Sequence, residues 1–567
     1  MRANLELLWM LAEHLLLTGL PGLAAVVLAT RRGLRSTPLL LALALAASGC
    51  VAMLSFWLFY ADPLVGETGS FLVVLAAIAA IVWAWRRGLE WDALRPLAVP
   101  AALWALASAF VLFLGFVHGG TAEPLTTAAS RFSHPLPGDN FLPLYFADYF
   151  YAHGHGGTPP DYASFLSSDR PPLQIGYVLA QRPFGWDGAQ LHYEVLGVVV
   201  QQLWILGLWA MLAAAGLTAR TRGLVALAAI VSDIAIVNGF FVWPKLIAAA
   251  FALAALAMVL SPDWRRWRRE PLAGALFAAL CGLALLAHGS SVFFIVPLLG
   301  FAALRGMPGL AWIGTALAVG IVLMAPWSAY QRYADPPGDR LLKWQLAGVL
   351  AIDDRGVVET IADSYREAGV AGTLRNKRGN VTQLVGQHDV EGAISAAVDE
   401  APAGHPGKAI IALRQPRFFD LLPFLGLLLL GPLAMAVARL RGRRPEGPDW
   451  RFATAGLGIA AAAVLFWVLA MFGTVESKAI LHVGSYAVPL LALCACVAGA
   501  CSVDRRLGSA LVAANVVVVL LLYAPALTPP AGSSYSPPAA LLAATALAGI
   551  GWLTLRPPRA AEPGPGG

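Results

Sequence analysis

The sequence predicts an all-α fold, a polytopic bundle of transmembrane helices. Of its 567 residues, 58% are hydrophobic and only 13% are charged, whereas soluble globular domains carry about 25% charged residues. The mean hydropathy is +0.69. Apolar runs of about 20 residues, the length at which a helix crosses a bilayer, recur along the chain. So few charges leave too little polar surface for a water-soluble protein of this length.

Fifteen apolar segments predict the membrane-crossing helices. Each is rich in Leu, Ala and Val, and polar, charged or glycine-containing turns separate it from the next segment. The segments are residues 7–29, 38–60, 69–85, 96–117, 193–216, 223–241, 246–260, 271–288, 290–304, 309–329, 417–438, 452–473, 479–501, 507–527 and 538–555.

Arginines mark one side of the predicted membrane. They follow every odd-numbered segment, from Arg31 after the first to Arg556 after the last. Because Lys and Arg collect in cytoplasmic connections, we expect these connections to be cytoplasmic, the N-terminus to lie outside the cell and the C-terminus inside. The protein would then span the plasma membrane, and its net charge of +6 would reflect orientation in the lipid bilayer rather than nucleic-acid binding.

Two connections on the predicted outer side are long and divide the chain. We expect three additional N-terminal helices, a helical core with a first acidic outer loop, a second outer loop, C-terminal helices and a disordered cytoplasmic tail. These parts correspond to residues 1–95, 96–330 with the acidic loop at 118–192, 331–415, 416–556 and 557–567. The five cysteines lie in or beside apolar segments without zinc spacing, so we interpret them as buried hydrophobic residues.

The first outer loop opens with acidic residues directly after an apolar segment. "HPLPGDNFLPLYFADYF" contains Asp139 and Asp148. Asp139 has two interpretations. A short carboxylate before a helix commonly caps its free N–H groups, whereas an ionisable group near the bilayer tends to mark a functional site.

The rest of that loop predicts two short helices lying along the membrane surface. "NFLPLYFADYFYAHG" is amphipathic and too short to cross a bilayer, which is typical of an interfacial helix. A second short apolar helix is expected from Pro172 to Phe184. Between them lie Asp169 and Arg170, so acids and a cation share one outer loop.

Cations recur at other outer turns, often beside an aromatic residue or proline. Interfacial snorkelling explains any one of them. Together they favour an anion at the outer surface, and a phosphate is the obvious candidate. They are Lys245 in "VWPKL", His288 in "LAHGSS", Arg340 and Lys343 in "DPPGDRLLKW", and Lys478 and His482 in "GTVESKAILHVGSYA".

These stretches, "GDN" with "SDRPPL", "WPKL", "DPPGDRLLKW" and "HVGSYA", resemble the GT-C superfamily of membrane glycosyltransferases, in their actinobacterial type. The family has an acidic first outer loop with two membrane-parallel helices and a second long outer loop after the seventh core helix. The resemblance covers roughly residues 96–415 and lies in layout more than in residue identity. The chain departs from the family in its three additional N-terminal helices, in lacking a "WWDYG" motif and in the displaced second acid.

The resemblance implies an inverting sugar transfer from a polyprenyl-phosphate donor to a glycan, lipid or protein acceptor of the cell envelope, without a metal or other cofactor. Asp139 would deprotonate the acceptor hydroxyl. The donor phosphate would meet Lys245, Arg340 and Lys343, with Arg170 behind them. Residues that would bind substrate or support the site are Asp148, Asp169, His288, Lys478 and His482.

Other classes remain open at the level of the sequence. A transporter or flippase for lipid-linked glycans explains many membrane helices and outer cations, but it predicts broken helices at matching positions of two repeats. A ligase of lipid-linked glycans is chemically close, and a noncatalytic scaffold does not account for the acids and cations. Asp233 lies inside a predicted membrane helix without an evident cationic partner, and we expect Ser232 and Asn238 to satisfy it.

Overall fold

The computed structural model describes residues 2–89, 91–134, 136–162, 164–186, 188–443, 446–473, 483–525 and 534–556. Within these ranges the chain is helical, and its β-structure is limited to one isolated bridge between Tyr162 and Phe165. The prediction of an all-α polytopic helical bundle is therefore confirmed. The predicted tail 557–567 lies outside the described residues.

Eleven helices or helix pairs in the described part of the chain are long and apolar enough to cross a membrane. They coincide with eleven of the predicted segments. They are α1 (Arg2–Arg31), α2 (Thr37–Ala61), α3 (Pro63–Arg86), α4 with α5 (Trp91–Gly115), α9 with α10 (Ala189–Ala214), α17 with its terminal turn η6 (Leu310–Ala334), α22 with α23 (Leu421–Leu440), α24 (Pro448–Ala470), η8 with α26 (Gly484–Val503), α27 (Arg505–Tyr523) and α28 (Pro537–Leu555).

The predicted count of about fifteen crossings is reached only by including weaker candidates. The segment 223–241 forms α11 (Ala219–Ile230) and α12 (Asp233–Phe241), which meet at a 50° bend. The other three predicted segments form the shorter apolar helices α13 (Lys245–Leu260), α15 (Pro271–Ala287) and η5 with α16 (Gly289–Leu304). At 1.5 Å per residue, a helix of 16 residues spans about 24 Å, less than the hydrocarbon core of about 30 Å.

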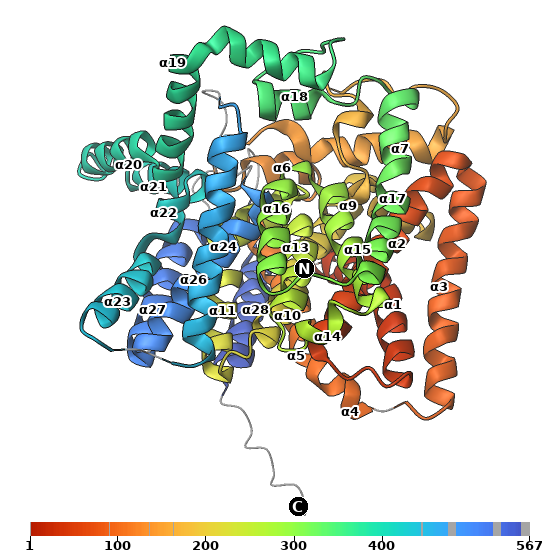
Figure 1. Ribbon diagram of the computed structural model, residues 1–567, viewed down its shortest axis with the longest axis horizontal. Coiled ribbons are helices and arrows are strands. Elements are labelled where there is room, and N and C mark those ends of the chain that lie inside the picture. Colours follow the sequence, from red (N-terminus) through yellow and green to blue (C-terminus); the bar gives the residue numbers. More distant parts are fainter. Residues whose placement is uncertain are drawn as a thin grey trace, which may run out of the picture.

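The centre of the bundle is built on small residues. Every residue of α13 except its last, Leu260, is buried, and Figure 1 shows this helix among α10, α15 and α16. A Cβ added at Gly207 of α10 would lie 2.2 Å from the carbonyl oxygen of Ala250 in α13. Glycine therefore lets the two backbones approach closely, as is common where membrane helices pack without a hydrophobic driving force between them.

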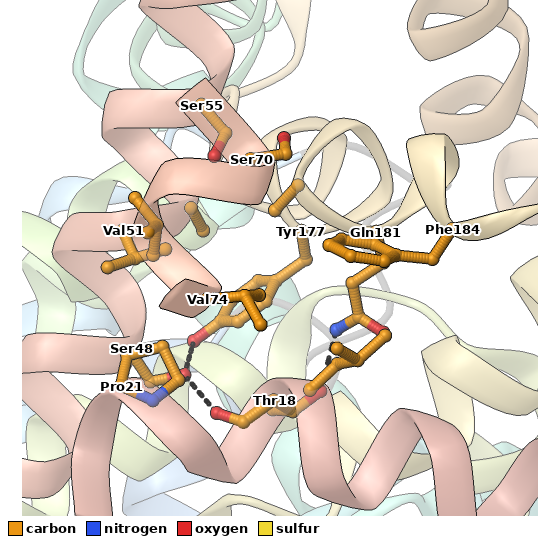
Figure 2. Close-up of a pocket in the computed structure, with 14 residues that line it drawn as sticks. Thr18, Pro21, Ser48, Val51, Ser55, Ser70, Val74, Tyr177, Gln181 and Phe184 are labelled. Carbon is orange, nitrogen blue, oxygen red and sulfur yellow. Dashed lines mark hydrogen bonds between the residues drawn. The ribbon is translucent and has the colours of Figure 1, made fainter. Parts of the chain in front are cut away.

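The three N-terminal helices pack directly on the first long connection. Figure 2 shows a small cavity, about 20 Å³, between α1, α2, α3 and α8 (Leu173–Gln181). The Ser48 hydroxyl lies 3.1 Å from the Tyr177 hydroxyl and donates to the Thr18 carbonyl at 3.0 Å, and the Gln181 amide donates to the Thr18 hydroxyl at 2.9 Å. The N-terminal helices thus hold α8 through buried polar contacts.

The two long connections lie at one end of the bundle. Figure 1 shows α7 (Leu142–His153), α18 (Arg340–Ala347) and the first half of α19 (Val357–Val385) at the top, and α4 with α14 (Trp264–Trp267) at the bottom. The first connection contains α6 (Pro124–Ser130), α7 and α8, so both predicted short helices form, while their position along the membrane surface stays a prediction. The second continues from α19 through α20 (Gln387–Glu400) and α21 (Pro406–Phe419).

Candidate functional site

A cavity of about 380 Å³ lies where the two long connections meet the ends of several bundle helices. Its polar and charged lining residues, which we call the polar wall, come mainly from the first long connection, the turn after α15 and the segment after α17. Apolar lining residues from α15, α16, α17 and α18 form what we call the apolar wall. The polar or charged residues that line it are Asp139, Asp169, Arg170, Gln174, His288, Gln331, Asp339 and Gln345.

Four of the residues singled out in the sequence line this cavity: Asp139, Asp169, Arg170 and His288. They come from segments almost 150 positions apart in the chain, so the fold brings them together. Among the described lining residues, Arg170 is the only lysine or arginine.

Asp139 pairs with Arg170 rather than capping a helix. It lies in the 3-10 turn η2 (Gly138–Phe141), and neither η2 nor α7 has a side-chain cap. Arg170 Nη2 donates to Asp139 Oδ2 at 2.7 Å, with 16% and 11% of the two side chains exposed. The capping interpretation is therefore not supported, and the carboxylate meets a guanidinium at the cavity wall.

The aromatic ring of Phe165 contacts two arginines. The guanidinium carbon of Arg170 lies 4.4 Å from the ring centroid, and that of Arg340 lies 5.1 Å from it. Arg340 Nη1 is 3.4 Å from Asp169 Oδ2. Such cation–π contacts strengthen when the groups are shielded from water, so Phe165 helps to fix both cations next to the two aspartates.

Asp169 is the most deeply buried of the cavity carboxylates. Burial raises the pKa of Asp169, and Asp335 raises it further, while the Leu166 N–H and the cations Arg340 and Arg170 act in the opposite direction. Its Oδ2 accepts the Leu166 N–H at 2.9 Å, whereas its Oδ1 is buried without a hydrogen-bond partner among the described residues. The effect of burial thus outweighs that of the neighbouring donors and cations, and the pKa of this carboxyl lies above its ordinary value.

Lys245 lies behind the cavity at the start of α13. The preceding turn is strained, because Val242 has a φ of 54°, a backbone conformation that β-branched residues rarely adopt. The turn puts the ammonium 3.8 Å from the ring centroid of Trp243 and 5.8 Å from that of Tyr486. The Lys245 side chain is fully buried and does not line the cavity, so its role at a phosphate stays a prediction.

His288 organises the next turn of the cavity wall. Its Nδ1 accepts the Ser290 N–H at 3.2 Å and lies 2.9 Å from the Ser290 hydroxyl, which in turn lies 2.6 Å from that of Ser485. These contacts tie η5 to η8 (Gly484–Tyr486). Nδ1 of His288 thus helps to hold the turn in place, and the same residue lines the cavity.

The other predicted phosphate ligands, Arg340 and Lys343, do not line the cavity. Arg340 donates to the carbonyls of Leu350 and Ser164, and Lys343 donates to the Asp353 carbonyl at 2.5 Å and pairs with Asp339 at 3.1 Å. Both side chains therefore brace the segment after α17, and their role at a phosphate stays a prediction.

The remaining predicted residues lie elsewhere or outside the described chain. Asp148 on α7 pairs with Arg182 at 2.9 Å, away from the cavity lining. Burial raises the pKa of Asp148, and Arg182 opposes that rise. Lys478 and His482 lie outside the described residues.

The structure provides a cationic partner that the sequence did not reveal for Asp233. Arg417 of α21 contacts both carboxylate oxygens of Asp233, at 3.0 Å and 2.8 Å. Ser232 instead caps α12, and the Asn238 amide donates to the Trp243 carbonyl. The expectation that Ser232 and Asn238 satisfy Asp233 is wrong, because the partner is 184 positions away in the chain.

The sequence interpretation also missed Asp335, which contacts the loop that carries Asp169 and Arg170. Its Oδ2 accepts the Ser167 hydroxyl at 2.6 Å and the Ser168 N–H at 3.0 Å. Its signal was present in "ADPPGDR", where an acid precedes two prolines directly after a membrane helix. That pattern, however, does not indicate that Asp335 contacts Ser167 and Ser168.

The fold and the cavity define a polytopic membrane protein with an acid–arginine pair at one end of its helical bundle. Comparison with family models, with curated proteins and with solved structures found no match for this chain. Within the described residues, no three His, Cys, Asp or Glu side chains are grouped to hold a metal ion.

Proposed function

We propose that this protein is an integral membrane glycosyltransferase of the GT-C type, which moves a sugar from a polyprenyl-phosphate donor to a cell-envelope glycan, lipid or protein. The observation that carries the proposal is the meeting of Asp139 and Arg170 in one cavity with an apolar wall. A lipid-phosphate donor requires a cation for its phosphate and an apolar surface for its chain, and transfer requires a base for the acceptor.

Asp139 is the proposed base in an inverting reaction. The acceptor oxygen attacks the anomeric carbon on the face opposite the phosphate, and its proton passes to the Asp139 carboxylate. The bond from the anomeric carbon to the phosphate oxygen breaks, and its electron pair leaves with the lipid phosphate.

Arg170 is the proposed partner of the negative charge that develops on the leaving phosphate. Guanidinium groups bind phosphate oxygens through two parallel hydrogen bonds, and fixed cations stabilise a leaving phosphate in the transition state. Arg170 Nη2 lies 2.7 Å from Asp139 Oδ2 and neutralises that carboxylate. When a donor phosphate takes Arg170 as its partner, the Asp139 carboxylate becomes free to accept a proton.

The apolar wall suits the lipid chain of the donor. Leu285, Val292, Met324 and Trp327 line it from α15, α16 and α17. Many side chains of α17 are exposed and apolar, among them Leu317, Ile321 and Val322. In a bilayer this surface faces lipid, so a polyprenyl chain can lie along α17 with its phosphate at the polar wall.

We further propose that the cavity opens on the outer side of the plasma membrane, in a bundle of about fifteen crossings. The arginine-rich turn at α14 lies at the end opposite α18 and α7 (Figure 1). By the positive-inside rule the α14 end is cytoplasmic. The three shorter apolar helices and the bent α11–α12 pair would complete the crossings.

The proposal is tested with the purified full-length protein in lipid nanodiscs. The protein is incubated with a panel of polyprenyl-phosphate hexoses and pentoses and with lipid-linked envelope glycans, and the release of polyprenyl phosphate is followed by mass spectrometry. We expect release with at least one donor and transfer of its sugar to an acceptor. The same protein is also reconstituted into sealed lipid vesicles, where movement of intact donor across the membrane without release of its sugar would instead indicate a flippase.

A further inference from the structure

We propose that Asp335 is a positioning residue, which holds the Asp169–Arg170 segment in place across the interface between the two long outer connections. The hydrogen-bond geometry carries this inference. Its consequence for catalysis rests on the proposed function.

Asp335 is buried and contacts the first outer connection directly. Only 2% of the residue is exposed. One carboxylate oxygen, Oδ2, accepts two hydrogen bonds, from the Ser167 hydroxyl at 2.6 Å and from the Ser168 N–H at 3.0 Å. Among the described residues no ion pair includes Asp335, so its charge is stabilised by hydrogen bonds. A buried carboxylate is costly without such donors.

Two neighbours of Asp335 contact the same serines. The Tyr330 hydroxyl lies 2.5 Å from the Ser167 hydroxyl. The Gln331 amide donates to the carbonyl of Ser168 at 3.0 Å and to that of Gly338 at 2.7 Å. Tyr330 and Gln331 lie in η6 (Tyr330–Ala334), and Asp335 is the residue that follows it.

The local form of the chain explains why these three side chains converge. The segment η6 is a π-helical turn, in which the Asp335 N–H bonds to the Tyr330 carbonyl at 3.1 Å. A π turn joins residues five positions apart instead of four, and such turns are frequent at functional sites. Here the turn brings the first residue of η6 and the residue after its last onto the same pair of serines.

The contacted serines lead directly into the cavity. Ser167 and Ser168 form the 3-10 turn η3 with Asp169. Asp169 bonds back to the Leu166 N–H at 2.9 Å, and the next residue, Arg170, reaches Asp139 at 2.7 Å. A shift of η3 would therefore move both the buried acid and the guanidinium. We name the contacts of Tyr330, Gln331 and Asp335 with Ser167 and Ser168 the serine clasp.

The test measures local opening of the clasp in the full-length protein by hydrogen–deuterium exchange of a peptide that covers residues 164–170. Asp335→Ala removes both acceptor contacts, and we expect exchange of this peptide to rise by about tenfold or more. Asp335→Asn retains an oxygen that can accept both bonds and should restore most of the protection. Asp363→Ala is the matched control, because this carboxylate of the same connection pairs with Arg355 and Arg366 away from the cavity.

A second variant covers the case in which Asp335→Ala does not fold. Ser167→Ala removes one donor from the other side of the clasp, and we expect a rise of several-fold in the same peptide. Unchanged exchange in Ser167→Ala and in any folded Asp335→Ala protein would overturn the proposal. So would an Asp335→Asn protein that opens as much as Asp335→Ala.

Transfer is measured in parallel on the same proteins. If the clasp positions Arg170, transfer should fall in Asp335→Ala, recover in Asp335→Asn and stay unchanged in Asp363→Ala. Increased exchange in Asp335→Ala, together with wild-type transfer rates, would overturn a role in positioning the reactive groups. If the wild-type protein transfers no sugar but exchange responds as expected, the clasp stands and the proposed function fails.

Discussion

At the scale of single residues, the central feature is a carboxylate whose partner also suits a phosphate. Asp139 and Arg170 are 2.7 Å apart at the wall of the cavity. The ion pair balances the two charges where both side chains are largely buried. It also couples the two proposed roles, because a phosphate that takes Arg170 leaves Asp139 unpaired.

Substitution of Arg170 should weaken donor binding more than substitution of a bracing cation. We expect Arg170→Gln to lower the affinity for polyprenyl phosphate by about tenfold or more, because a charge-assisted contact is lost. Lys343→Ala is the comparison, since Lys343 is bound to Asp339 and to the Asp353 carbonyl outside the cavity lining. Binding is measured by native mass spectrometry in nanodiscs. Equal losses in the two variants would contradict the assignment of Arg170.

The protonation of Asp169 should appear in the pH dependence of stability. Burial raises the pKa of Asp169 above its ordinary value of 3.8. The folded protein therefore binds this proton more tightly than the unfolded chain does. The contribution of protonated Asp169 to stability is complete at a pH below the ordinary pKa and is lost as the pH rises through the folded-state pKa.

Asp169→Asn replaces the acid with a neutral group of the same shape and removes this dependence. We expect wild-type Tm, relative to that of Asp169→Asn, to fall as the pH is raised from about 4 towards 7. Thermal unfolding at several pH values in one detergent provides the comparison. A difference that stays constant, or grows in favour of wild type, would contradict a raised pKa.

At the scale of elements, close helix contacts position the acidic loop. The helix α8, which follows Arg170, lies against α2 at Gly176. A Cβ added there would lie 2.1 Å from the Ala52 carbonyl oxygen, so something would have to shift. The N-terminal helices, which lie outside the resemblance to the glycosyltransferase family, thus support the loop that carries the site.

Gly176→Ala should therefore destabilise the bundle, by about 1–3 kcal/mol, the usual scale of overpacking. Gly320→Ala on α17 is the matched control. An added Cβ meets nothing within 4 Å there, and alanine is the better helix former. Thermal unfolding of the two variants in nanodiscs makes the measurement. If Gly176→Ala unfolds at the same temperature as the wild-type protein, the contact between α2 and α8 is looser than the structure indicates.

Most of the helices could be predicted from the sequence, because their signal is local. Runs of apolar residues identify a membrane helix without reference to the rest of the chain, and the short helices of the first long connection follow from proline and amphipathic patterns. The bend between α11 and α12 was less accessible. It occurs at Val231 and Ser232, inside the segment 223–241 that the sequence predicts as one membrane helix, and Ser232 caps α12.

The site could be predicted only in part, because its geometry is set by contacts between distant segments. The composition of the outer turns indicated Asp139, Asp169, Arg170 and His288, which line one cavity. It could not distinguish Arg170, whose side chain lines the cavity, from Arg340, whose donors are taken by backbone carbonyls. Side-chain partners depend on the packing of loops, and sequence patterns do not encode that packing directly.

At the scale of the whole molecule, the proposal requires that the cavity end face outward. In a cysteine-free background, we expect an impermeant maleimide to label His155→Cys in intact cells. Residue 155 is exposed and follows α7 at the cavity end. Arg266→Cys on α14, at the opposite end, is the control and should react only after permeabilisation. The reverse pattern would invert the topology and place the cavity in the cytoplasm.

The measurement that tests the central claim most directly compares Asp139→Asn with the wild-type protein in the transfer assay. Asparagine keeps the shape and an acceptor oxygen for Arg170 but is a far weaker base than a carboxylate. We expect the wild-type thermal stability to be largely kept and sugar transfer to fall by about a hundredfold or more, the scale of losing a general base. An Asp139→Asn protein that transfers sugar at the wild-type rate would contradict the account.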